Sequence, residues 1–232
     1  MIEVTNSSEF KRLIQALSLD ITSAAIHYRK FKRLLTTLNE NPDVEANART
    51  FWSLTLEGAL TMCLQALCRA FDQEKTGLHL VNWLRTIEAN SHLFSETNFR
   101  ERLKENSFVE SLAAETKQPD PNVLKSDIEA CSAKDPLVRT LVIHRGNRIA
   151  HRNAKNIVEE FDIDTDHPLG YSEIETLIDR AVSVLNRYSA MFDANTYSTS
   201  MIGEDDYEYV IESIKGQIQL AKARRGDQRP ET

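Results

Sequence analysis

Long stretches without turn-forming residues constrain this chain more than any other feature. Only seven glycines and six prolines occur in 232 residues, and aromatic residues make up 7%. Glycine and proline mark turns, and sheet proteins need many turns between their short strands. The sequence therefore predicts an all-α protein, and its 41% hydrophobic residues are enough for a sizeable core.

Apolar periodicity and capping residues locate the expected helices. The predicted ranges are about 10–38, 46–71, 79–90, 97–116, 122–132, 136–153, 172–192 and 203–225. The range 46–71 is apolar on more than one side, which indicates a central, buried helix. Asp135 and Pro136 suit an N-cap and a first helical turn, and Ser172 with Glu175 predicts a capping box.

The sequence shows no internal repeat and no long linker. The simplest arrangement is one helical bundle over residues 1–195, a peripheral C-terminal helix over 196–225 packed on the same domain, and a flexible tail over 226–232. A polar N-terminus and the lack of about 18 uninterrupted apolar residues predict a cytoplasmic protein without a membrane span.

The cysteines give no sign of metal or disulfide chemistry. Cys63, Cys68 and Cys131 are odd in number and form no CxxC pair. None has a histidine at metal-ligand spacing. We expect reduced structural thiols, no metal and no cofactor.

Positive charge gathers in residues 136–158, here called the basic island. This range carries +5 and no acidic residue, while the rest of the chain carries −12. Its cations are Arg139, Arg145, Arg148, Arg152 and Lys155. Such a cluster can hold phosphate if it shares one concave surface or is doubled by symmetry. The plainer alternative is a solvated helix face.

Helical geometry singles out Arg145 within the basic island. At about 100° per residue, Leu137, Leu141 and Ile149 belong to one apolar arc, and Arg145 falls at its centre. A guanidinium facing a core costs several kcal/mol unless it is paired or the arc opens onto a cleft. His144, Arg148 and His151 flank this arc if the helix continues through Gly146, where glycine permits a bend.

Histidine and arginine together suit the cleavage of RNA. Histidine exchanges a proton near neutral pH, and arginine presents paired donors to phosphate oxygens. In this reaction the ribose 2′-hydroxyl attacks the adjacent phosphorus, so the nucleophile belongs to the substrate. No metal is needed.

The stretch RGNRIAHRN, residues 145–153, resembles the motif of the HEPN superfamily (higher eukaryotes and prokaryotes nucleotide-binding). That motif is an arginine, four to six residues, then a histidine. The spacing also occurs at Arg85 to His92 and at Arg139 to His144, where the intervening residues are those of ordinary helices. We interpret these two as accidental. Residues 51–90 also resemble the abortive-infection, AbiU-like branch of the superfamily, with a long apolar helix ending in Arg-x-x-Asp.

The resemblance implies a HEPN-like bundle that dimerises through the motif helix, with both motifs facing one cleft. It implies a metal-independent endoribonuclease acting as a toxin or antiphage effector, with RNA as substrate and an antitoxin of nucleotidyltransferase type as a further expected partner. Arg145 becomes the phosphate-binding residue and His151 the proton-transfer group.

The other candidate residues have less definite roles. Family members commonly have Asn, Asp or His directly after the arginine, but this chain has Gly146. Either Asn147 takes that polar role in catalysis, at i, i+4 to His151, or the site is impaired. Arg148, Arg152 and His144 are candidate RNA contacts, the first two being solvated charges otherwise. Arg69 and Asp72, at i, i+3, predict a local ion pair or, alternatively, a role in orienting the site.

Two other functions stay open. A HEPN-like domain without catalysis would serve as an RNA-binding or protein-interaction module, which Gly146 and the acidic total charge favour. A purely structural bundle would leave Arg145 and His151 pointing apart.

Overall fold

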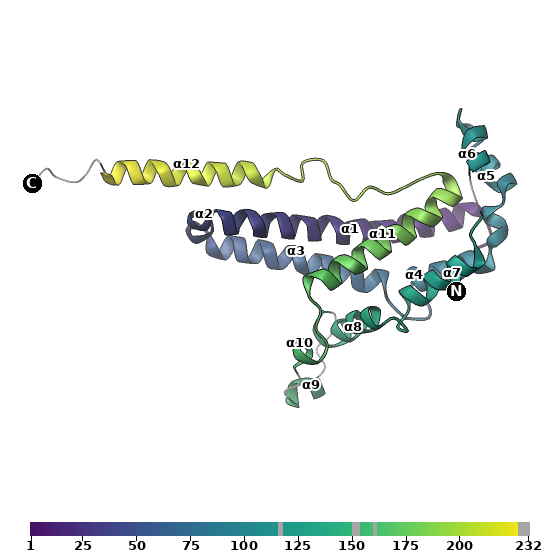
Figure 1. The fold of residues 1–232 in the computed structure, drawn as a ribbon, viewed down its shortest axis with the longest axis horizontal. Helices are drawn as coiled ribbons and strands as arrows, with labels where there is room; N and C mark the ends of the chain where they lie inside the picture. The colour runs from purple at the N-terminus through teal and green to yellow at the C-terminus, as the bar shows by residue number, and fades with distance from the viewer. Residues whose placement is uncertain (116–117, 150–153, 160–161, 227–232) are drawn as a thin grey trace, which may run out of the picture. The chain divides into compact units, whose positions relative to one another are not determined.

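The computed structural model describes residues 1–115, 118–149, 154–159 and 162–226, and every secondary-structure element in these ranges is a helix (Figure 1). In chain order they are α1 (Ser7–Glu40), α2 (Pro42–Asn47), α3 (Arg49–Ala70), α4 (Leu80–Ala89), η1 (Ser91–Phe94), α5 (Glu96–Arg102), α6 (Val109–Glu115), α7 (Pro121–Cys131), α8 (Pro136–His144), η2 (Arg145–Ile149), α9 (Ala154–Val158), α10 (Ile163–Asp166), α11 (Tyr171–Asp193) and α12 (Tyr207–Gly226). The predicted all-α class is confirmed.

The prediction of a single helix over 97–116 is wrong. This range contains two helices, α5 and α6, with a break between them. In the break, the Asn106 side chain accepts a hydrogen bond of 2.9 Å from the Phe108 backbone N–H. Asparagine often binds the local backbone in this way and so competes with helix formation.

Two further details of the helices differ from the expectation. The prediction of a capping box at the start of α11 is wrong. The N-cap is Gly170, and the Ser172 hydroxyl donates a hydrogen bond to Glu173. The loop expected over 161–173 contains α10, whose N-cap Asp162 accepts a hydrogen bond from the Asp164 N–H.

Contacts divide the chain into two compact units. Unit 1 comprises Met1–Ala25 and Met62–Thr199, and unit 2 comprises Ile26–Thr61 and Ser200–Thr232. Both units include parts of α1 and α3, so this grouping does not test the predicted domain boundaries.

Aromatic side chains form part of the core of unit 1. The Phe10 ring lies 6.2 Å from Trp83 and 4.9 Å from Phe192, measured between ring centroids, and Trp83 meets Tyr188 edge-on at 6.0 Å. All four side chains are at most 1% exposed. These contacts join α1, α4 and α11, and each ring pair adds about 1 kcal/mol to the area that it buries.

Unit 2 has a separate small core. Ile211 of α12 packs against Leu34, Leu38, Val44 and Trp52, from α1, α2 and α3. Figure 1 shows α12 running beside this part of α1. The C-terminal helix is therefore attached by apolar contacts within unit 2.

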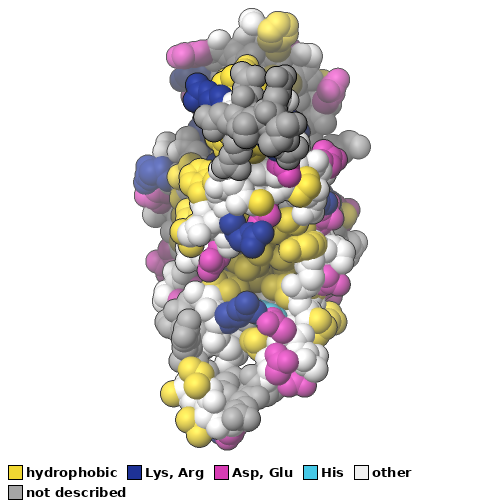
Figure 2. Space-filling model, turned by 90° about the vertical axis from the view of Figure 1, so that its left-hand side faces the viewer, with side chains coloured by type: hydrophobic (Ala, Val, Ile, Leu, Met, Phe, Trp, Pro, Cys, Tyr) yellow, Lys and Arg dark blue, Asp and Glu magenta, His cyan; other side chains and the backbone are white. Residues whose placement is uncertain are grey.

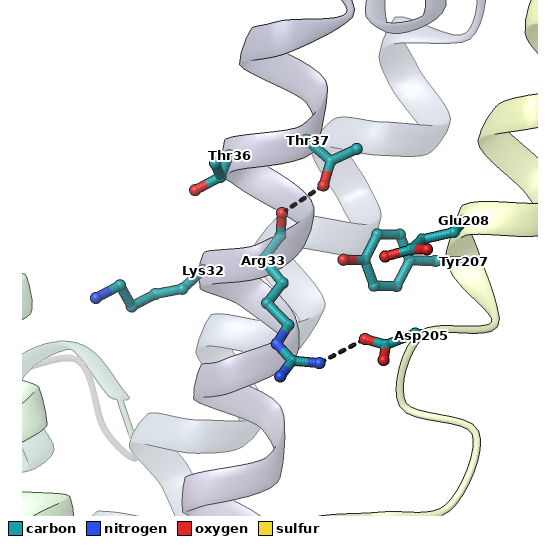
Figure 3. A pocket seen from close by; sticks show the side chains of 7 residues that line it. All are labelled: Lys32, Arg33, Thr36, Thr37, Asp205, Tyr207 and Glu208. Carbon is teal, nitrogen blue, oxygen red and sulfur yellow. Dashed lines mark hydrogen bonds and ion pairs between the residues drawn. The ribbon is translucent and has the colours of Figure 1, made fainter.

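A pocket of about 500 Å³ lies in unit 2 between α1 and the start of α12 (Figure 3). Its lining includes Arg33, Thr37 and Tyr207. Arg33 forms ion pairs with Glu204, at 3.1 Å, and with Asp205. The Arg33 guanidinium in this pocket is thus already paired with acids.

The helix α3 was expected to be central and buried. In unit 1 its last turns fit this expectation, since Cys63 and Leu67 are fully buried, but in unit 2 Phe51 and Leu54 are 56% and 63% exposed. Among the described helices, α3 alone is long and apolar enough to cross a membrane, with 33% of its most apolar window buried. This test uses length and composition only, and core helices of soluble proteins also pass it.

The loop between α3 and α4 is held by one buried side chain. Asn82, 3% exposed, donates from its side-chain amide to the carbonyl oxygens of Glu74, Lys75 and Gly77, at 3.2, 2.9 and 2.9 Å. His79 adds a ring-nitrogen contact of 2.8 Å to the Glu74 carbonyl. Loop carbonyls that lack a partner are costly, so these bonds fix the loop.

We predict that Asn82→Ala lowers the free energy of unfolding by about 2 kcal/mol, because it removes a buried amide whose hydrogen bonds to three loop carbonyls fix the loop. Urea denaturation followed by circular dichroism measures the change. Asn122→Ala is the control, since Asn122 is exposed and should change stability by less than about 0.5 kcal/mol. Equal effects at both positions would contradict the role given to Asn82.

Candidate functional site

The basic island does not form one continuous α-helix. Asp135 caps α8 as predicted, accepting hydrogen bonds from the N–H groups of Leu137 and Val138. The α-helix then ends at His144, and Arg145–Ile149 form a π-helical turn, η2. Helical angles extrapolated at a constant step therefore do not hold beyond Arg145. Single π turns inside helices occur often at functional sites.

Arg145 is paired with Asp72. Its guanidinium Nη1 donates to the Asp72 carboxylate at 2.9 Å, and the two side chains are 35% and 19% exposed. The sequence predicts that Arg145 needs either a partner or a cleft. The structure gives it a partner, Asp72, just after the end of α3. Arginine carries five N–H donors, so one such bond leaves donors for a phosphate group.

The local ion pair predicted between Arg69 and Asp72 is wrong. Arg69 donates to Asp20 of α1 at 2.7 Å, which leaves Asp72 to Arg145. Burial raises the pKa of the Cys68 thiol to about 12, and the charges of Arg145, Asp72 and Arg69 all act on this thiol. The two ion pairs thus lie around one buried, protonated cysteine.

His144 and Asn147 contact the backbone. His144 is 4% exposed, and its Nε2 lies 2.6 Å from the His167 carbonyl oxygen. The Asn147 side-chain amide donates to the Ile143 carbonyl at 2.7 Å. The RNA contact expected of His144 and the catalytic role expected of Asn147 stay predictions, and this geometry gives both residues a structural task as well.

Arg148 is paired on the surface. Its guanidinium donates to both carboxylate oxygens of Asp164 in α10, at 2.9 and 2.6 Å, and both side chains are more than 60% exposed. Figure 2 likewise shows Lys and Arg side chains beside Asp and Glu side chains on the face that it draws. An exposed ion pair is worth little, so a phosphate can replace Asp164 at low cost.

His151 and Arg152 lie outside the described residues, so their predicted roles stay predictions. Within the described part of the basic island, the structure joins Arg145 to Asp72 and Arg148 to Asp164. Sequence reasoning missed Asp20, the partner of Arg69. No local pattern marks it, because 49 residues separate the two.

The three cysteines are free and buried, as expected of structural thiols. In the part of the chain that the structure describes, no group of three or more His, Cys, Asp or Glu side chains is placed to hold a metal ion.

Comparison with known protein families identifies a relationship. The HEPN family model described as AbiU2 matches residues 7–212. No curated protein and no solved structure matches the chain.

The departure at Gly146 has no steric cause in the structure. A Cβ atom built at Gly146 meets nothing within 4 Å, and the same holds for Gly58 in α3. The first atom of a side chain at this position therefore meets no obstacle among the described residues.

We predict that Gly146→Ala raises the free energy of unfolding by about 0.5–1 kcal/mol, since alanine loses less backbone entropy on folding than glycine. Urea denaturation is the measurement. Gly58→Ala is the matched control and should give a similar gain. A loss of stability confined to Gly146→Ala would show that this glycine permits a close approach within the folded protein.

Proposed function

The chain belongs to the HEPN family of AbiU2 type, and from this premise we propose that it is a metal-independent endoribonuclease. The observation that carries the proposal is the pairing of the motif arginine, Arg145, with Asp72 at 2.9 Å. This pair holds a guanidinium at a partly open position, and arginine suits the recognition of phosphate.

The proposed reaction uses the substrate's own nucleophile. The ribose 2′-oxygen attacks the adjacent phosphorus, the bond from phosphorus to the 5′-oxygen breaks, and the products are a 2′,3′-cyclic phosphate and a 5′-hydroxyl end. His151 takes the proton of the 2′-hydroxyl, or gives one to the leaving oxygen. Arg145 stabilises the negative charge that grows on the phosphate oxygens in the transition state.

The proposal extends to partners and location. We place the protein in the cytoplasm, as a toxin or antiphage effector that acts on RNA. Two subunits face each other through their motif segments, and an antitoxin of nucleotidyltransferase type restrains them. Ile157 and Val158 of α9, just after the motif, are 62% and 82% exposed. Such apolar surface supports a subunit contact there.

One observation favours the alternative, a HEPN domain that binds RNA or protein without cleaving it. Gly146 lacks the polar group common in the motif, although a Cβ atom built here meets nothing within 4 Å among the described residues.

We predict that the purified protein cuts total cellular RNA in EDTA and leaves 2′,3′-cyclic phosphate ends. Arg145→Ala and His151→Ala should each lower the rate by at least about a hundredfold, the usual contribution of a proton-transfer or charge-stabilising group. Mapping of the cut ends by sequencing gives the measurement.

The two other stretches with motif spacing provide the controls. Arg139→Ala and His92→Ala remove exposed side chains from those stretches and should leave the rate unchanged. Intact RNA with the wild-type protein, or equal losses in all four variants, would contradict the catalytic assignment. Binding without cleavage would favour the alternative.

We predict that Asp72→Asn lowers kcat about tenfold and changes KM less, because Asp72 orients Arg145 without touching the substrate. Steady-state cleavage of a short RNA measures both constants, and Asp72→Glu should recover part of kcat. Asp164→Asn is the control, since it removes only the exposed partner of Arg148. Equal kcat values for Asp72→Asn and the wild type would show that Asp72 does not position Arg145 for catalysis.

A further inference from the structure

A second pocket lies in unit 1 at the loop between α3 and α4. Its volume is about 460 Å³. The lining residues are Met1, Gln73, Lys75, His79, Val81, Asn82 and Arg85. The basic side chains Lys75 and Arg85 are exposed, so a ligand can reach both.

The charges at this pocket are unbalanced. Among the described residues, neither Lys75 nor Arg85 has an acidic partner. The two carboxylates that precede Lys75 in the loop are occupied, since Asp72 binds Arg145 and Glu74 accepts hydrogen bonds from Thr76 and Gly77. The pocket of unit 2 differs, because its Arg33 is paired with acids.

The polar groups that line the pocket are fixed. The Asn82 side chain binds three loop carbonyls, and the Gln73 side chain donates to the carbonyls of Phe71 and Cys131 and accepts from the Ala133 N–H. The Asn82 and Gln73 side chains therefore form a preformed part of the pocket lining, which also includes the exposed Lys75 and Arg85.

The pocket adjoins the Arg145–Asp72 pair. Gln73, in its lining, directly follows Asp72 in the chain. Burial lowers the pKa of His79, and Asp72 and Arg85 act on this same ring with opposite signs. Asp72, the partner of Arg145, thus directly precedes one lining residue and acts electrostatically on another, His79.

We propose that this pocket is a subsite for a backbone phosphate of the RNA strand, held by Lys75 and Arg85, next to the phosphate bound by Arg145. The inference rests on the proposed function, which supplies the ligand class. Lysine and arginine without acidic partners supply the sequence-independent part of RNA binding. Neither residue contacts the reacting atoms, so their task is to hold the strand.

The test uses a fluorescent single-stranded 2′-O-methyl oligonucleotide, which lacks the nucleophilic hydroxyl and cannot be cut. Binding to the wild-type chain and to Lys75→Gln/Arg85→Gln is measured by anisotropy at several salt concentrations. We expect about tenfold weaker binding in the variant, and a salt dependence whose slope falls by about 0.7, the value for one lost phosphate contact.

The control is Arg12→Gln/Lys125→Gln, which removes one exposed arginine and one exposed lysine of unit 1. An equal loss in both double variants, or an unchanged slope, would overturn the subsite, as would a wild type that does not bind the oligonucleotide. If uridine 5′-monophosphate binds as tightly as the oligonucleotide, the ligand of the pocket is a free nucleotide and the RNA-strand subsite is overturned.

Cleavage assays separate this inference from the proposed function. If the protein binds the oligonucleotide through Lys75 and Arg85 but leaves total RNA intact, the subsite stands and the nuclease assignment fails. If RNA is cut but KM is unchanged in Lys75→Gln/Arg85→Gln, the nuclease stands and the subsite fails.

Discussion

The ion pair between Arg145 and Asp72 connects the basic island to the end of α3, and the geometry of the candidate site depends on it. The two residues are 73 positions apart in the chain, and their side chains are largely withdrawn from water. A guanidinium in such a place is costly without a partner. Asp72 offsets this cost, and it does so from one side, so the remaining donors of Arg145 can bind a phosphate.

The arrangement of carboxylates around this pair decides which cations are open to a ligand. Asp72 is held by Arg145, and Glu74 is held by the backbone of its own loop. Among the described residues, Lys75 and Arg85 have no acidic partner beside this pocket. The chain is acidic overall, at −7, but the two carboxylates that precede Lys75 already have partners. This pairing of nearby carboxylates explains how an acidic protein can have a local positive site.

Most of the fold was predictable because helix formation is encoded locally. Apolar spacing and capping residues predicted α1, α4, α7 and α11 within a few residues, and Asp135 marked the start of α8. The helix predicted over 136–153 was wrong in its end, because α8 stops at His144. The predictions were wrong where one side chain chose a different local partner, as Asn106 does between α5 and α6 and Ser172 does at the start of α11. A residue pattern shows which hydrogen bonds a side chain is able to form, but not which of them forms in the folded protein.

The candidate site was predictable in part. The sequence by itself determined the helical class, the charged island and the HEPN-type motif, because these are properties of neighbouring residues. The tertiary structure alone decided that Arg145 pairs with Asp72 and Arg69 with Asp20, and that the chain turns through a π-helix at Arg145. Those ion pairs join residues 73 and 49 positions apart. Such partners meet only when helices pack, and helix periodicity carries no information on which helices meet.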